Sequence, residues 1–257
     1  MRHSGKVRHP ERNEGSAATN VMGGIREFFS RRGRIRLTGA VIFLWFVASG
    51  HARDWYALSP EEFAAQPAVQ ARIDPEKFDG TLLAAAIFQE TNRVRRQLGL
   101  VRFTHVAKLD VAAERKASLG VFETELKHTS DFPFAATPAD RVKAAGLDYA
   151  RVAENLARIS SYDLPAGMSQ LGVRKRNGSD EFYRTDTGRP PELQTYVGFA
   201  TQVVASWMKS PGHHDNIVDP RFLSLGCAAR PCRSFISRHE QIYAMQVFFT
   251  PHVVKKK

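Results

Sequence analysis

Apolar side chains recur at three- and four-residue spacing in four segments after residue 78, which is the pattern of a helix with one buried face. The first segment is bounded by Asp79, which can cap a helix, and by Gly99, which can end one. The third segment is bounded in the same way by Thr137 and Gly146. The expected helices cover residues 80–98, 106–127, 138–145 and 194–209.

Three shorter segments have the composition of β-strands, and they cover residues 151–159, 225–230 and 241–250. Residues 160–193 show no period and predict an inserted loop. Residues 210–221 are expected to form a structured turn, because they contain prolines and a glycine. Residues 53–78 carry three prolines and predict an irregular lead-in. Helices that precede and separate a few strands define the class α+β, with the helices stacked on a small antiparallel sheet.

The composition and the charge distribution exclude several classes of protein. The 257 residues are 43% hydrophobic and 25% charged, which excludes a disordered chain and a polytopic membrane protein. The formal net charge of +11 comes mostly from the two ends, since residues 1–36 hold nine basic and three acidic groups and the tail 255–257 is three lysines. Residues 37–254 hold 25 basic and 23 acidic groups, so we expect no nucleic-acid partner.

The basic N-terminus is followed by an uncharged apolar stretch, residues 37–49, and then by small residues around Ala52. This order is typical of a secretory signal, and the stretch is shorter than the roughly 20 residues that span a bilayer. Residues 1–52 are therefore expected to be a basic leader and signal, cleaved after Ala52, with Met22 as an alternative start. The alternatives are an uncleaved anchor and a buried core helix. The protein is expected to be secreted or periplasmic; in the alternative it is membrane-anchored and faces outward, so membrane contact would occur only through an uncleaved signal.

The chain contains two cysteines, Cys227 and Cys232, and both follow the leader. An oxidising compartment would allow a disulfide between them across a short hairpin, and this is the favoured interpretation. Two unpaired thiols and a metal site are the alternatives, although a lone pair of cysteines lacks the second pair that structural zinc sites use.

Several short motifs occur in a fixed order along residues 82–250. The motifs are NRVR at 92–95 with Gly99 and Leu100, His128, AENLA at 153–157, WMKSPGHHDNI at 207–217, SLGCA at 224–228 and YAMQVF at 243–248. Together they resemble a CAP domain in its bacterial form, an SCP-like fold that is shared by cysteine-rich secretory proteins, insect antigen 5 and plant pathogenesis-related proteins.

The resemblance implies a three-layer α-β-α sandwich over residues 79–254, with an insertion at 160–193 and a cleft lined by histidines and glutamates that can hold a divalent metal. Carried over by position, the cleft residues are His128, Glu154 and His213. Ser210 stands where animal members have a second glutamate, and His214 stands where bacterial members usually have arginine.

Two imidazoles and one carboxylate suit a zinc ion with one open coordination position, which a metal hydrolase would use to ionise water. The alternative is a polar cluster that joins the sheet to the helices or binds a ligand, because a carboxylate at a strand centre needs partners. Ser210 and His213 are not expected to act as a hydrolytic pair, since two residues three positions apart in a Pro-Gly turn rarely have the geometry for it. We expect the Ser210 hydroxyl to cap the turn instead. Asn155 and Asn216 are expected to be structural anchors, and Trp207 is expected in the core.

The sequence therefore predicts an exported CAP-domain protein whose cleft binds a lipid-like, cell-envelope or peptide ligand. The alternative function is a divalent-metal-dependent hydrolase that acts through the same cleft, and a third interpretation is a membrane-anchored assembly partner. Residues 160–193 are expected to form a mobile flap beside the cleft, because this segment connects the Glu154 strand to the helix that leads to His213.

Overall fold

The computed structural model describes residues 54–164, 171–233 and 239–252. Contacts divide the chain into two units, residues 1–51 and 52–257, and every described residue belongs to the second. The expected leader therefore lies outside the described residues. No helix in the described part of the chain is long and apolar enough to span a membrane.

The core of the second unit is a mixed four-stranded sheet with the strand order β1-β5-β6-β2. Its strands are β1 (Thr104–His105), β2 (Tyr149–Ser160), β5 (Ser224–Arg233) and β6 (Glu240–Pro251). The three long strands pair antiparallel, as expected, but β1 pairs parallel to the start of β5. The expected sheet was wrong in this respect, because a two-residue strand is too short to give a periodic pattern.

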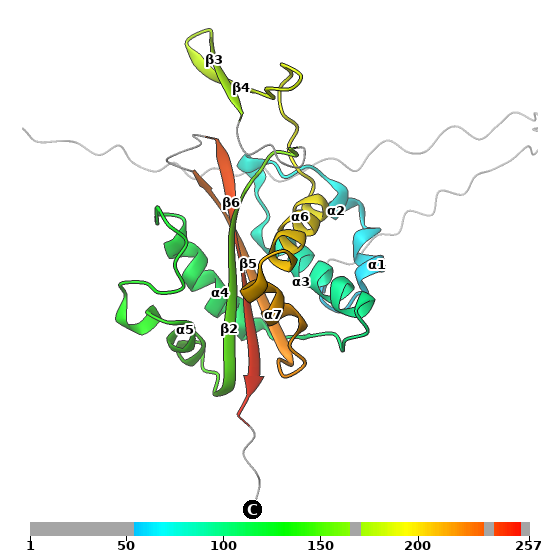
Figure 1. Cartoon of the computed structure of the whole chain (residues 1–257), viewed down its shortest axis with the longest axis vertical. Helices are drawn as coiled ribbons and strands as arrows, with labels where there is room; N and C mark the ends of the chain where they lie inside the picture. The colour runs from blue at the N-terminus through cyan, green and yellow to red at the C-terminus, as the bar shows by residue number, and fades with distance from the viewer. Residues whose placement is uncertain (1–53, 165–170, 234–238, 253–257) are drawn as a thin grey trace, which may run out of the picture. The chain divides into compact units, whose positions relative to one another are not determined.

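Helices cover both faces of this sheet, which gives the α-β-α sandwich that Figure 1 shows. One layer holds α3 (Gly80–Gln97), α6 (Tyr196–Met208) and α7 (Pro211–Val218), and the other holds α4 (Ala107–Gly120) and α5 (Pro138–Ala144). The strands supply both cores in alternation. In β6, Ala244 and Phe248 pack towards α3 and α6, whereas Met245 and Val247 pack towards α4 and α5. A central strand with both faces buried has a nearly continuous apolar sequence, as β6 does.

The N-terminal lead-in is more regular than the prolines suggested. It contains α1 (Pro60–Ala64), α2 (Pro67–Gln70) and a 3₁₀ turn, η1 (Pro75–Lys77), each with proline near its start. Proline is tolerated there because the first helical N–H groups have no partner within the helix. Before α1, the Tyr56 ring stacks on His105 at a centroid distance of 3.4 Å, which fastens the lead-in to β1.

The helix expected over 106–127 ends at Gly120, so this prediction was seven residues too long. Gly120 packs directly on the ring of Tyr243, where a side chain would not fit, since an added Cβ would lie 2.4 Å from the ring. Beyond the end, Arg158 donates to the carbonyl oxygens of Gly120, Glu123 and Thr124. These bonds hold the following segment in an irregular path rather than a further helical turn. A second 3₁₀ turn, η2 (Pro133–Ala135), then leads into α5.

Two segments expected to be irregular contain regular structure. Residues 210–221 include helix α7, and Pro211 is its first residue rather than a helix breaker. Residues 160–193 include an antiparallel hairpin, β3 (Gly172–Arg176) and β4 (Ser179–Tyr183). Asn177 and Gly178 turn this hairpin at φ values of 51° and 82°. Asn-Gly is a strong signal for such a turn, and the sequence interpretation missed it.

The predicted disulfide was wrong. Cys227 and Cys232 are free and buried, and both belong to β5 rather than to a hairpin. Five positions along one strand separate them by roughly 16 Å, whereas bridged cysteines need Cα atoms within about 7 Å. They also lie in different cores, Cys227 on the α3 side and Cys232 on the α4 side. The error follows from the length of β5, which continues to Arg233.

Candidate functional site

The candidate site lies at the outer edge of the sheet, where β2 pairs with β6 on one side and has no strand on its other side among the described residues. Neighbouring side chains of this strand point to opposite faces. Glu154 points towards α5 and is buried, while Asn155 points towards α7 and is also buried. The two polar residues in the centre of β2 therefore contact different helical layers.

Glu154 forms a buried ion pair with Arg141 of α5. The Arg141 Nη2 atom lies 2.7 Å from both carboxylate oxygens, its Nε atom lies 3.2 Å from Oε1, and both side chains are 0% exposed. A buried carboxylate is tolerated only when its charge is neutralised and its oxygens accept hydrogen bonds. The sequence interpretation named histidines as these partners and missed Arg141, because its burial is visible only in the folded structure.

His128 lies at the solvent side of this pair. Its Nδ1 atom is 3.5 Å from Glu154 Oε2, and 51% of its side chain is exposed. The sequence placed His128 directly after a helix, but α4 ends earlier, and His128 lies within the irregular segment before α5. Two buried cations hold that segment: Arg141 donates to the His128 carbonyl at 2.8 Å, and Lys116 donates to the Thr129 carbonyl at 3.0 Å.

His213 approaches from the opposite layer, on the first turn of α7. Its carbonyl accepts a hydrogen bond from Asn155 Nδ2 at 3.1 Å, which ties α7 to the edge strand. Partial burial lowers the pKa of His213 below its usual value, and the neighbouring charge of His128 lowers that pKa further. Both effects favour the neutral form of the His213 imidazole.

A buried network of side-chain amides connects β2 to α7 and to β6 next to the two histidines. Asn155 Nδ2 donates to Gln246 Oε1 at 3.0 Å, and Gln246 Nε2 donates to the hydroxyl of Thr91. Asn216 Nδ2 donates to Asn155 Oδ1 at 2.9 Å and to the Glu154 carbonyl at 3.3 Å. Asn155 and Asn216 therefore have the anchoring contacts that the sequence interpretation expected of them.

The remaining candidates lie around this centre. Trp207 is buried, and its indole N–H donates to the Leu156 carbonyl at 3.1 Å, so another backbone acceptor at the β2 edge is occupied. Ser210 precedes α7 as its N-cap residue, but its hydroxyl makes no capping bond, so that expectation was wrong. His214 contacts Asp215 at 3.3 Å and is 41% exposed, on the solvent side of α7.

The zinc-ligand set expected from the sequence does not fit this geometry. Both oxygens of Glu154 accept hydrogen bonds from a permanent guanidinium cation, which competes with any metal for the carboxylate. No group of three histidine, cysteine, aspartate or glutamate side chains in the described residues is placed to hold a metal ion. The imidazoles of His128 and His213 are the remaining donors.

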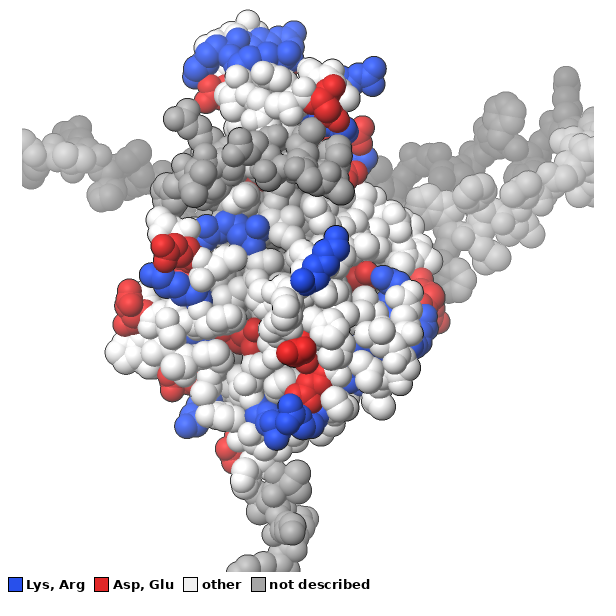
Figure 2. Space-filling view, viewed as in Figure 1, with Lys and Arg blue, Asp and Glu red and all other residues white. Residues whose placement is uncertain are grey.

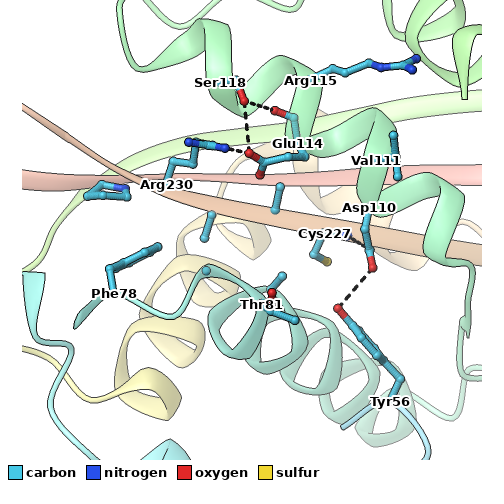
Figure 3. A pocket seen from close by; sticks show the side chains of 15 residues that line it. Tyr56, Phe78, Thr81, Asp110, Val111, Glu114, Arg115, Ser118, Cys227 and Arg230 are labelled. Carbon is cyan, nitrogen blue, oxygen red and sulfur yellow. Dashed lines mark hydrogen bonds and ion pairs between the residues drawn. The ribbon is translucent and has the colours of Figure 1, made fainter. Parts of the chain in front are cut away.

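A separate groove of about 690 Å³ lies at the opposite edge of the sheet, between α3 and α4, and Figure 3 shows it. Asp110 accepts hydrogen bonds from the Tyr56 hydroxyl and from the backbone N–H of Cys227, and Arg230 pairs with Glu114 across the groove. The hydrogen bond to Asp110 thus satisfies the backbone N–H of Cys227, which points outward from β5. This groove is lined in part by Cys227, but it contains none of the three cleft residues that the sequence predicted, His128, Glu154 and His213.

The expected flap over 160–193 includes the β3–β4 hairpin, which projects beyond the end of β2 in Figure 1. Basic side chains gather at its tip in Figure 2. Arg174 and Arg176 both pair with Glu181, and Lys175 pairs with Asp180, so acidic partners within the hairpin offset these charges. The mobility of the segment stays a prediction.

The three-layer α-β-α sandwich, with a histidine on each side of the sheet near the edge of β2, is the arrangement that the sequence resemblance implied. Residues 88–248 match the Cysteine-rich secretory protein family, also called CAP. The chain belongs to this family, as the sequence motifs predicted.

No curated protein matches the chain. Among solved structures, it is similar to an outer surface protein from Borrelia burgdorferi, with 15% identity, a TM-score of 0.43, and coverage of 71% of this chain and 99% of that one. It is also similar to an extracellular SCP-domain protein from Bacillus anthracis, with 18% identity, a TM-score of 0.42, and coverage of 70% and 44%. A cysteine-rich secretory protein from Staphylococcus aureus gives 13% identity, a TM-score of 0.39, and coverage of 66% and 39%. The chain therefore spans less than half the length of these last two structures.

Proposed function

We propose that this chain is an exported binding module, and that the site at the β2 edge, where His128 and His213 lie, holds a peptide or a peptide-bearing cell-envelope fragment. The imidazoles of His128 and His213 make the direct contacts. Export is supported by the basic and apolar leader and by the family to which the chain belongs.

The observation that carries this proposal is the bidentate pair between Arg141 and Glu154. A hydrolase at this site would need Glu154 as a metal ligand or as a general base, and a permanent cation bound to both of its oxygens opposes either role. Both oxygens accept hydrogen bonds from Arg141 at 2.7 Å. No hydrogen bond joins Ser210 to His213 in the described part of the chain, so a serine nucleophile lacks an activating base. Binding is the function that this geometry supports best.

The chemistry of the two histidines favours a peptide-like ligand over a purely apolar lipid. A neutral imidazole offers one N–H donor and one nitrogen acceptor, which match the carbonyl and N–H of an amide. An imidazole N–H can also donate to a ligand carboxylate. Peptides and the stem peptides of peptidoglycan carry both groups, whereas an alkyl chain carries neither.

The test is a titration of the full chain with a soluble disaccharide-tetrapeptide from peptidoglycan, followed through the ¹⁵N-labelled histidine rings. We expect the resonances of His128 and His213 to shift with saturation, and H128A or H213A to weaken binding about tenfold or more. H214A is the matched control, since His214 is the adjacent exposed histidine and should leave the affinity unchanged. Vesicles of phosphatidylglycerol provide the lipid comparison, and preferential binding to them would contradict the proposed ligand class.

The competing hydrolase is tested on the same samples by mass spectrometry of the tetrapeptide probe, with casein and a nitrophenyl ester as further substrates. Binding without turnover supports the module. Turnover that a chelator stops and that H213A abolishes would establish the metal-dependent enzyme instead.

A further inference from the structure

Arg141 connects three parts of the site that lie apart in the sequence. Besides its bonds to Glu154, its Nη1 atom donates to the Ala135 carbonyl at 2.7 Å and its Nη2 atom donates to the His128 carbonyl at 2.8 Å. The guanidinium therefore binds both ends of the segment between these two residues. It also joins that segment, through Glu154, to the centre of β2.

Lys116 supports the same segment from α4. Its ammonium group is fully buried, contacts both carboxylate oxygens of Glu123 at 2.7 Å, and donates to the carbonyl of Thr129. Two successive carbonyls, those of His128 and Thr129, are thus held by two different buried cations. The backbone position of His128 is set by these contacts and not by a regular secondary-structure element.

The guanidinium of Arg141 also opposes metal binding by the Glu154 carboxylate. An arginine side chain stays protonated at every accessible pH, so the positive charge beside this carboxylate is permanent. A divalent ion at the same oxygens would have to approach that charge within a few ångströms in a buried environment, where repulsion is strong. It would also have to replace the hydrogen bonds that both oxygens already accept.

We propose that Arg141 is the permanent cation of this site and takes the place of a metal ion beside Glu154. Glu154 acts as the counterion of Arg141, and neither as a metal ligand nor as a base. This assignment of Arg141 and Glu154 goes beyond the proposed function. It does not depend on which ligand the site binds, because it concerns only the charges that the chain itself places there.

The proposal is tested by zinc titration calorimetry on the full chain, comparing the original protein with R141K and R141M. Methionine fills similar space without charge, so R141M frees Glu154 to join the two histidines. We expect its zinc affinity to rise about tenfold or more, the scale of effect that groups around a metal ligand typically have. R141K is the matched control, since it keeps a cation beside Glu154 and should bind zinc like the original protein. The gain should disappear in the double variant R141M/E154Q.

E154Q in the otherwise unchanged chain gives the complementary result. If Glu154 is only a counterion, this change should alter zinc affinity by less than about twofold. If Glu154 is a ligand, the affinity should fall about tenfold or more. Such a fall, or zinc affinity in R141M equal to that of R141K, would overturn the proposal. Circular dichroism establishes that each variant is folded, and E154Q decides the matter if R141M is not.

Discussion

Replacing Gly226 with alanine should destabilise the fold strongly, because this glycine is where helix α4 lies directly on strand β5. A Cβ atom built on Gly226 would lie 2.4 Å from Leu109 Cβ, 2.5 Å from the Leu109 carbonyl carbon and 2.6 Å from the Asp110 nitrogen. Two of these three atoms are backbone atoms, so no rotation of a side chain can relieve the overlap. The helix or the strand must move as a whole.

The expected magnitude follows from these distances. Ordinary carbon–carbon contacts lie near 3.5 Å, so the two elements must separate locally by about 1 Å. Added methyl groups in packed cores typically cost about 1–3 kcal/mol, and the rigid neighbours here favour the upper end of that range. A loss of about 3 kcal/mol lowers the melting temperature of a domain of this size by roughly 6–12 °C.

The assay is urea unfolding of G226A, followed by tryptophan fluorescence and circular dichroism, with G212A as the matched control. Gly212 lies near the start of α7 with nothing within 4 Å of an added Cβ, so alanine should leave stability unchanged or raise it by up to about 1 kcal/mol. A cost below about 1 kcal/mol for G226A would refute the reasoning, since it would mean that α4 moves away from β5 freely. Equal effects of the two variants would refute it as well.

Other expected outcomes concern the site and the core. The pKa of His213 is lowered by burial and by His128, so the folded state binds fewer protons at this residue than the unfolded chain does. The free energy of unfolding should therefore be higher above about pH 6.5, and it should fall as the pH drops towards the lowered pKa. H128A should raise the pKa of His213 in an NMR titration, and an unchanged value would contradict the contact. Burial raises the pKa of both Cys227 and Cys232, so Ellman's reagent should react slowly with native protein and find two thiols per chain after unfolding without reductant; finding none would contradict the free thiols. W207F should cost about 1–3 kcal/mol in urea unfolding, because Trp207 is buried and its indole donates to a β2 carbonyl, and an unchanged midpoint would show that this bond contributes nothing.

Local signals predicted most of the helices and long strands. Helix α3 was found because Asp79 caps it and its apolar face is periodic, and the observed bounds differ from the expectation by one residue at its end. Strand β6 was found from its apolar and aromatic composition. Helix α7 was missed because proline and glycine within a short segment indicate a turn when no neighbouring layer is known. The two-residue β1 exists only because β5 lies beside it.

The candidate site was predicted in part. The motifs pointed to His128, Glu154 and His213, and the structure places His128 3.5 Å from Glu154 and close enough to His213 to affect its pKa. Arg141 was missed because nothing local distinguishes a helical arginine that is exposed from one that is buried. Its role depends on a carboxylate that reaches it only after β2 has packed on α5.

The sequence by itself determined the class of this protein, because helix caps, apolar periodicity and the order of short motifs are local properties that survive without a tertiary structure. It also determined that most of the excess positive charge lies at the two ends of the chain. Only the tertiary structure decided the partners of the charged groups and of the cysteines. Whether Glu154 faces a metal or Arg141, and whether Cys227 meets Cys232 or lies in another core, depends on which face of a strand is covered by which helix. Such pairings join residues far apart in the chain, and their energies depend on burial that no local pattern encodes.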